Sequence, residues 1–206
     1  MGTTLDVVNE WASDSEEKQV AVKTRSGLVL RWINQAQLRF AERSECLRGE
    51  WQPTITSTGN IALPSDFIRE FPDLVKYNLS ATVNPPLVKI DYWQAVNVTF
   101  SSTTHYSIFN GSLYVWAAGA LTPSIPYIKK PTVITALTTA DLSIPTEFHR
   151  DLIPYLDIMW EKSKGSLSLG DRLALMKEFD NQAGLAGLKF KTRQDGMFKM
   201  RSNRLG

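Results

Sequence analysis

The chain has 206 residues, of which 43% are hydrophobic and 21% are charged, and its net charge at pH 7 is +2. These values are typical of a globular protein of one domain or two small ones, and they exclude a strong general attraction to nucleic acid. A single cysteine, Cys46, excludes an internal disulfide, and two histidines far apart in sequence are too few for a structural zinc site, so we expect neither a metal nor a cofactor.

The N-terminal part of the chain predicts a short helix followed by a loop. Thr3 or Thr4 can cap a helix over residues 5–12, because a hydroxyl at this position accepts a hydrogen bond from a free backbone N–H. The acidic run SDSEEK that comes next is predicted to be the loop.

A longer helix is predicted from about Ser26 to Leu47. Its apolar residues recur at the spacing of one helical face, and Gly49 is placed to end it. The apolar stripe consists of Val29, Trp32, Ile33, Ala36 and Phe40.

The middle of the chain has the composition of a β-rich segment. WQPTITSTGNIALP predicts two short strands around Thr58, Gly59 and Asn60, whereas PSDFIREF predicts a short helix with Pro64 in its first turn. LVKIDYWQAVNVTF is rich in the β-branched and aromatic residues that strands favour. PYIKKPTVITAL predicts a further strand at a sheet edge, because Pro131 interrupts it.

The clearest local pattern is YSIFNGSLYVWA. Asn110 and Gly111 stand between two strand-like runs, and both residue types tolerate the positive φ angles that a two-residue turn of type I′ requires. The pattern therefore predicts a β-hairpin.

No aspartate, glutamate, lysine or arginine occurs between Tyr92 and Ile128. The stretch is too rich in serine, threonine, asparagine, glycine and proline to span a bilayer. Two interpretations remain open. It is either a β-rich segment with neutral polar faces or a surface that neighbouring subunits cover, because the centres of protein interfaces are depleted of charge.

Helices are predicted again after residue 142. Pro145 suits a first helical position, and Pro154 should kink this helix or mark a restart, because proline cannot donate a backbone hydrogen bond. A last helix is predicted from about Ser168, its cap, to Ala186. The apolar stripe of the first of these helices consists of Phe148, Leu152, Leu156 and Trp160.

The C-terminal run LKFKTRQDGMFKMRSNRLG carries six cations and one carboxylate, a balance of +5 that leaves −3 for the remainder of the chain. A basic terminus is either a solvated, disordered tail or a segment that docks on a partner. Aromatic and methionine residues between the charges favour docking. The candidate docking residues are Lys189, Phe190, Lys191, Arg193, Met197, Phe198, Lys199, Met200, Arg201 and Arg204.

The run HRDLIPYL begins like the catalytic loop of protein kinases, but its context contradicts a kinase. Leu156 stands where that loop needs an asparagine for a magnesium ion, and the sequence has no glycine-rich phosphate loop, D-F-G or V-A-I-K lysine. We expect His149, Arg150 and Asp151 on the polar side of a helix. The sequence also lacks a G-x-S-x-G elbow and a P-loop, so it predicts no catalytic residues.

Five motifs follow one another along residues 5–186: RWINQAQLRFAER, IALPSDFIRE, YSIFNGSLYVW, IPYIKK and SIPTEFHRDLIPYLDIMW. In this order they resemble the head-to-tail connector, or adaptor, proteins of tailed bacteriophages. The resemblance implies an α+β fold, in which a small helical bundle carries an inserted antiparallel β-hairpin or β-section and an extended C-terminal arm. The expected domains are a bundle of residues 1–50 and 143–188, a β-rich insertion of residues 51–142, and a basic arm of residues 189–206.

The resemblance also implies a function without enzymatic activity. Members of this family form a ring, typically of twelve subunits, which lies beneath the portal, extends the DNA channel and offers a platform for the tail. Their C-terminal arms reach up between portal subunits, as the basic run here would do. The expected interface with the tail or a neighbouring subunit consists of Phe109, Asn110, Gly111, Tyr114 and Trp116.

The expected partners are copies of the chain, the portal, and a tail or further neck protein, in a virion neck that is assembled in the host cytoplasm without a membrane. Genomic DNA would pass through the lumen without specific binding. Two other functions stay open. The protein could bind DNA through its basic tail, or its β-section could bind sugars if Trp93 and Trp116 were exposed on one platform.

Overall fold

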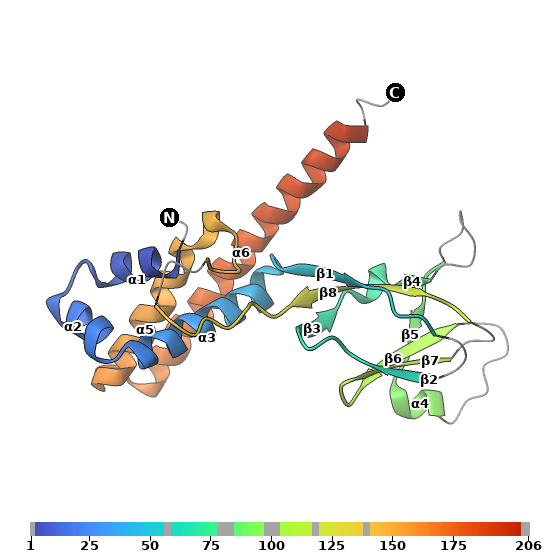
Figure 1. The fold of residues 1–206 in the computed structure, drawn as a ribbon, viewed down its shortest axis with the longest axis horizontal. Helices are drawn as coiled ribbons and strands as arrows, with labels where there is room; N and C mark the ends of the chain where they lie inside the picture. Colours follow the sequence, from blue (N-terminus) through green and yellow to red (C-terminus); the bar gives the residue numbers. More distant parts are fainter. Residues whose placement is uncertain are drawn as a thin grey trace. The chain divides into compact units, whose positions relative to one another are not determined.

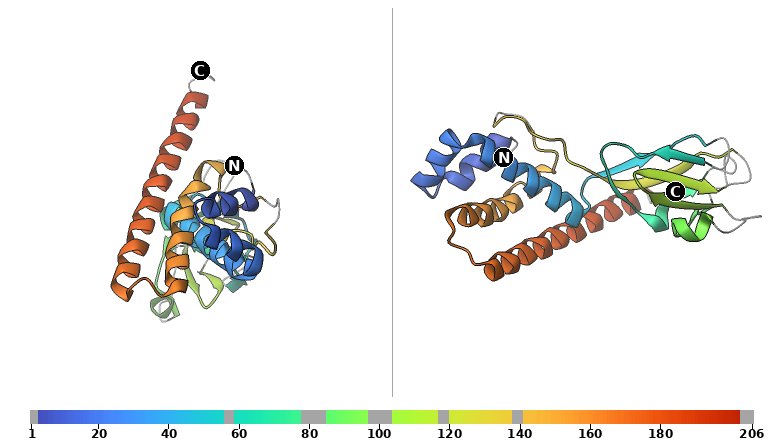
Figure 2. Two further views of the ribbon diagram at one scale, coloured as in Figure 1. Left: turned by 90° about the vertical axis from the view of Figure 1, so that its left-hand side faces the viewer. Right: turned by 90° about the horizontal axis from the view of Figure 1, so that it is seen from below.

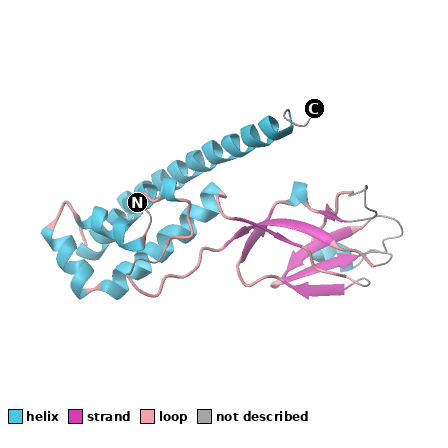
Figure 3. Ribbon diagram, turned by 45° about the horizontal axis from the view of Figure 1, so that its top comes forward, coloured by secondary structure: helices cyan, strands magenta, loops and turns pink. Residues whose placement is uncertain are grey.

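The structure is a computed structural model that describes residues 3–55, 59–77, 85–96, 104–116, 120–137 and 141–202, with side chains up to residue 191. Its fold is α+β, as predicted, with helices in the first and last parts of the sequence and two small sheets formed by the middle (Figures 1 and 3). The chain divides into two compact units. The helical unit comprises residues 1–47 and 130–206, and the sheet unit comprises residues 48–129.

The helical unit begins with a capped helix, as predicted. The Thr3 hydroxyl accepts a hydrogen bond from the Asp6 N–H (3.2 Å), and the Asp6 carboxylate accepts one from the Thr3 N–H (3.1 Å). The helices of this unit are α1 (Thr4–Ala12), α2 (Glu16–Thr24), α3 (Ser26–Ser44), the 3-10 turns η2 (Thr146–Phe148) and η3 (Arg150–Leu152), α5 (Ile153–Lys164) and α6 (Leu169–Ser202).

Two predictions for the first part of the chain were wrong in part or in full. The acidic run is a loop only at residues 13–15, because the Ser15 hydroxyl caps α2 and two glutamates in the first turn of that helix favour its dipole. Helix α3 ends at Ser44 rather than near Gly49, since Glu45 adopts the left-handed conformation (φ 53°). Gly49 instead lies in a strand, where a Cβ atom would stand 2.8 Å from the Tyr127 ring.

The C-terminal helices restart at Pro154, one of the two outcomes predicted. Two 3-10 turns precede it, and α5 then begins with Pro154 in its first turn, where no intrahelical N–H is needed. Helix α6 continues far beyond the predicted end at Ala186, to Ser202, so the basic residues up to Ser202 belong to this helix. No proline follows Pro154, and most residues of the run are good helix formers. Both views of Figure 2 show α6 running past the other helices of its unit.

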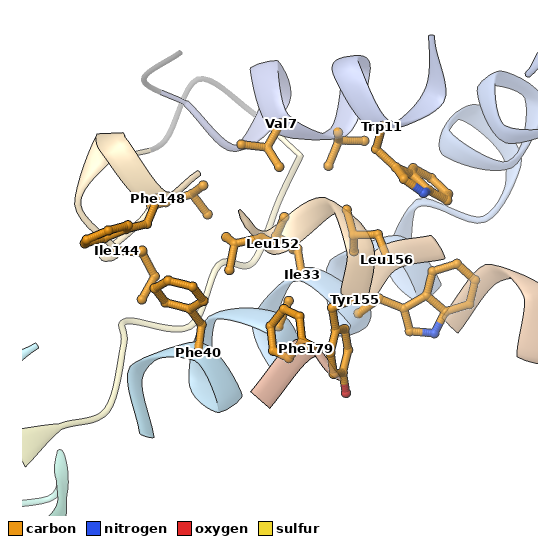
Figure 4. Close-up of a cluster of buried hydrophobic side chains, with 14 of the residues drawn as sticks. Val7, Trp11, Ile33, Phe40, Ile144, Phe148, Leu152, Tyr155, Leu156 and Phe179 are labelled. Atoms are coloured by element: carbon orange, nitrogen blue, oxygen red, sulfur yellow. The ribbon is translucent and has the colours of Figure 1, made fainter. Parts of the chain in front are cut away.

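The core of the helical unit joins α1, α3, α5, α6 and the segment before η2. Aromatic rings meet edge-on or tilted, with centroids 6.3 Å apart for Trp11 and Trp32 and 5.5 Å apart for Phe40 and Phe148. Figure 4 shows the inward-pointing side chains, among them Val7, Ile33, Ile144, Leu152, Tyr155, Leu156 and Phe179. The predicted apolar stripes of α3 and of residues 148–160 are confirmed as core.

The sheet unit contains two four-stranded sheets. In the first, the order is β1-β8-β3 and β4 also pairs with β8; in the second, the order is β2-β7-β6-β5. The elements are β1 (Arg48–Trp51), β2 (Gly59–Ala62), β3 (Phe67–Glu70), the 3-10 turn η1 (Pro72–Leu74), β4 (Lys76–Tyr77), β5 (Val88–Lys89), α4 (Tyr92–Val96), β6 (His105–Phe109), β7 (Ser112–Trp116) and β8 (Pro123–Lys129). Their own core includes Ile55, Val75, Tyr106, Leu113, Val115 and Ile125.

The predicted hairpin is confirmed. Strands β6 and β7 pair antiparallel from His105 opposite Trp116 to Phe109 opposite Ser112. The two turn residues have positive φ, 47° at Asn110 and 72° at Gly111, as a type I′ turn requires.

Other predictions for the sheet unit were wrong. Within PSDFIREF, Phe67–Glu70 form strand β3 rather than a helix. Gly59 and Asn60 lie within β2 rather than between two strands, and Thr58 falls outside the described residues. Strand β8 is central rather than at an edge, because it ends at Lys129, before the proline that was expected to interrupt it. The pairing partner, which lies far away in the sequence, decides whether each of these segments forms a strand and where that strand lies in the sheet.

Candidate partner-binding surfaces

An aromatic face covers one side of the second sheet. Side chains alternate along β6 and β7, so Tyr106, Leu113 and Val115 point into the core while Phe109, Tyr114 and Trp116 point to the other side. Helix α4 lies against β6 and adds two rings to that side. We call the five residues Tyr92, Trp93, Phe109, Tyr114 and Trp116 the aromatic face.

The rings of the aromatic face are packed on one another and partly open to solvent. Tyr92 stacks on Phe109 (centroids 4.4 Å apart, planes at 7°), and its centroid is 4.7 Å from Tyr114. Trp93 meets Phe109 edge-on at 5.5 Å, and Tyr114 and Trp116 stack at 6.3 Å. The exposed fraction is 63% for Trp93 and 37% for Phe109. Exposed aromatic rings in a stretch without charge have the composition of a protein interface.

The sequence placed Phe109, Tyr114 and Trp116 at an interface and named Trp93 only as part of a sugar-binding platform, but it missed that α4 brings Tyr92 and Trp93 to this face. It predicted a strand there, because the run is rich in aromatic and β-branched residues. One local signal could have found the helix. The Asp91 carboxylate accepts hydrogen bonds from the backbone N–H groups of Trp93 (2.9 Å) and Gln94 (3.4 Å), which is how aspartate caps a helix start.

The basic segment comprises residues 188–206, of which those up to Ser202 belong to α6. Phe190 packs against Phe148, with centroids 5.9 Å apart, and Lys191 forms an ion pair with Glu45. Lys189 lines a hollow beside Asp151. The remaining candidate residues from Arg193 to Arg201 follow along the helical backbone, and Arg204 lies outside the described residues.

The residues of the kinase-like run serve the structure of the bundle. His149 is buried rather than on a polar side, and its Nε2 atom donates a hydrogen bond to the Ile144 carbonyl (2.8 Å). Arg150 is exposed and pairs with Glu10 (3.1 Å). Burial raises the pKa of the Asp151 carboxyl, an effect that nearby Lys189 opposes.

Within the described ranges, no three histidine, cysteine or acidic side chains come together as metal ligands would. Among the described helices, none is both long enough and apolar enough to cross a membrane. What these ranges do present to other molecules is an exposed aromatic face and a long helix with a basic end, the features of a protein that works by association.

Phage head-to-tail adaptors are proteins that work by association in this way. A family model described as SU10 adaptor protein matches residues 2–203, nearly the whole chain. The chain therefore belongs to the SU10 adaptor protein family, and the resemblance drawn from its motifs is confirmed. It is a family of structural adaptor proteins. Comparison with curated proteins found no match.

Proposed function

We propose that this protein forms a ring, of twelve copies, beneath the portal of a phage neck, where it extends the DNA channel and carries the tail. Membership in the SU10 adaptor family is the observation that carries this proposal. The two surfaces described above give it a physical basis, because each suits a different partner.

The basic segment is the proposed contact with the portal. Its cations can steer it to an acidic groove, and its aromatic and methionine residues can anchor it there. Because Phe190 and Lys191 already contact the helical unit, we assign portal docking to the residues from 192 onward. A continuous helix loses less conformational freedom on docking than a disordered arm, and a ring of such helices attaches with a high effective concentration.

The aromatic face, with Asn110 and Gly111 in the adjoining turn, is the proposed contact with the tail or with a neighbouring subunit. A contact surface without charge avoids the desolvation of ions on assembly. DNA would pass through the lumen without specific binding, in keeping with the charge of −3 on the chain outside the basic segment.

Electron microscopy or native mass measurement of the protein mixed with its portal tests this function. We expect a ring on the portal. A chain shortened after Lys191 should keep its fold, because the contacts of Phe190 and Lys191 remain, but should no longer attach. If the full chain gives no complex, the proposed function fails; if the shortened chain attaches as well as the full one, the portal-docking role of the segment fails.

A second candidate function is DNA binding, which the charge of +5 on the basic segment favours. Release of counterions would then make the affinity for duplex DNA fall steeply with salt. Measuring this affinity at several salt concentrations separates the two functions, since an adaptor should bind duplex DNA weakly at all of them.

A further inference from the structure

An apolar groove runs along α6 on the side of α5 and the two 3-10 turns. Two hollows, of about 280 and 430 Å³, share Gln182, which lies between them on α6. On both walls the lining residues recur every three or four positions, so the groove lies between two helical surfaces. Grooves of this shape accept a third helix.

The floor of the groove is apolar and partly uncovered. Ile158 and Phe179 are buried beneath it, while Leu175 and Leu185 are 37% and 59% exposed. An additional helix lying in the groove would cover these leucines.

The rim of the groove is strongly acidic. Five carboxylates and a single lysine, Lys189, line the two hollows. The carboxylates belong to Glu147, Asp151, Asp157, Glu161 and Glu178. Asp157 is already paired with Lys18 (2.8 Å), and the charge of Lys189 acts on Asp151. An occupant that fits this groove is therefore a helix with apolar and positively charged residues.

The chain itself carries such a helix. Residues 192–204 contain four cations and one carboxylate, together with two methionines and a phenylalanine, and their backbone is helical up to Ser202. They cannot reach the groove of their own copy, because α6 is continuous and forms one wall of it. Phe198 lies 16 residues beyond Gln182, or about 24 Å along the helix axis.

We propose that the acidic groove of one copy binds the basic end of α6, residues 192–204, of a second copy. The groove and the segment are different surfaces, so each copy can receive one segment and donate another. A contact of this kind repeats from copy to copy and generates a ring or a chain. The portal and the groove would compete for the same segment, so the groove would hold it until the portal is met. This last consequence rests on the portal docking proposed above, whereas the contact between copies does not.

Sedimentation velocity of the full-length chain without portal tests the contact. Reversing the rim, Glu161→Lys with Glu178→Lys, should raise the dissociation constant for self-association at least tenfold. Reversing the segment, Lys199→Glu with Arg201→Glu, should do the same. The matched control for the rim reversal is Glu16→Lys with Glu42→Lys. It changes the net charge by the same amount as the rim reversal, at exposed positions outside the groove, and should leave the constant within threefold of the native value.

A chain that combines both reversals distinguishes a direct contact from a damaged fold. The reversed groove would then face a reversed segment, so self-association should recover to within about threefold of the native chain. Absence of self-association in the native chain, or failure of the combined chain to recover, overturns the inference. Portal binding is measured separately. The rim variant should still bind the portal, so loss of the contact between copies can be distinguished from failure of the proposed function.

Discussion

Gly187 lies where α6 crosses the end of α3, and no larger residue fits there. A Cβ atom at this position would stand 2.1 Å from the carbonyl oxygen of Ser44 and 2.7 Å from its Cα atom. These are backbone atoms, so they cannot move aside as a side chain could. Gly184, one turn earlier in the same helix, has nothing within 4 Å of its Cβ position.

The substitution Gly187→Ala should therefore push α6 away from α3 and lower the free energy of unfolding by about 1–3 kcal/mol. Gly184→Ala is the matched control and should raise it by up to about 1 kcal/mol, because alanine favours the helix. Urea denaturation of the two variants measures the difference. Equal stability of both would show that the close approach does not exist.

Tyr106 is fully buried in the sheet unit, and its hydroxyl has no hydrogen-bond partner among the described residues. Burial, with smaller effects of Glu70 and Asp73, raises the pKa of this hydroxyl above its ordinary value of 10.0. The folded state therefore keeps the proton while the unfolded chain loses it as the pH rises through 10. The contribution of Tyr106 to stability is thus present below pH 10 and declines above it.

Replacing Tyr106 by phenylalanine should raise the free energy of unfolding by up to about 1 kcal/mol at pH 7, since an unpaired hydroxyl leaves the core. The gain in unfolding free energy should be larger at pH 10.5. At that pH the Tyr106 hydroxyl of the unsubstituted protein ionises in the unfolded state but not in the folded state, and phenylalanine removes this effect. Tyr127→Phe is the control: its hydroxyl donates to Asp66 (3.0 Å), so stability should fall by about 0.5–1.5 kcal/mol. Denaturant midpoints of the variants at the two pH values measure these changes. A loss of stability in Tyr106→Phe would show that the Tyr106 hydroxyl has a hydrogen-bond partner after all.

Among the elements, those with local signals could be predicted from the sequence. The Thr3 cap, the apolar stripe of α3, the Asn110–Gly111 turn and the restart at Pro154 all depend on residues within a few positions of each other. Strands β3 and β8 depend instead on partners up to 80 residues away, and short apolar runs fit a strand or a helix equally well. For the same reason α4 was predicted as a strand, so the contribution of Tyr92 and Trp93 to the aromatic face was missed.

The hairpin makes a prediction at this scale. Gly111 has φ 72° and open space around its Cβ position, so Gly111→Ala meets no clash but places an alanine in a left-handed conformation. We expect a loss of about 1–2 kcal/mol in the stability of the sheet unit. Asn110→Gly accepts the same backbone angles and should change stability by less than about 0.5 kcal/mol. Thermal unfolding followed by circular dichroism provides the comparison; unchanged stability of Gly111→Ala would exclude the type I′ turn.

The ion pairs between α3 and α6 lead to another prediction about stability. Asp180 accepts two hydrogen bonds from Arg39 (2.6 and 3.0 Å) and forms an ion pair with Arg43 (3.1 Å), while its own side chain is only 16% exposed. This hydrogen bonding raises the pKa of the Arg39 guanidinium against the opposing effect of burial. Asp180→Asn should cost about 1–3 kcal/mol of unfolding free energy in urea. Glu42→Gln on the exposed side of α3 serves as control and should change the unfolding free energy little. If Asp180→Asn has an equally small effect, the ion pairs of Asp180 contribute nothing to stability.

At the scale of the whole molecule, the order of motifs along the chain was more informative than any single residue. Each motif is weak alone, yet together they predicted the adaptor family that the match over residues 2–203 shows. The groove along α6 could not be predicted in this way. Its two walls come from residues 147–161 and 175–190, and its hollows depend on how these helices pack.

The two units have hydrophobic cores that share no residue, which leads to a prediction about cooperativity. The chain passes between the units only at residues 47–48 and 129–130. Removing the Phe179 ring from the helical core, or the Ile125 side chain from the sheet core, should cost about 2–5 kcal/mol within the unit concerned. The other unit should retain its stability, because none of its core contacts changes.

Hydrogen exchange measured peptide by peptide tests this prediction. Phe179→Ala should raise exchange in α1, α3, α5 and α6 and leave β6 and β7 as protected as in the native chain. Ile125→Ala should give the reverse pattern. Equal loss of protection in both units from either substitution would show that they unfold as one. Independent units would allow the basic end of α6 and the aromatic face to respond separately to the partners proposed for them, the portal and the tail.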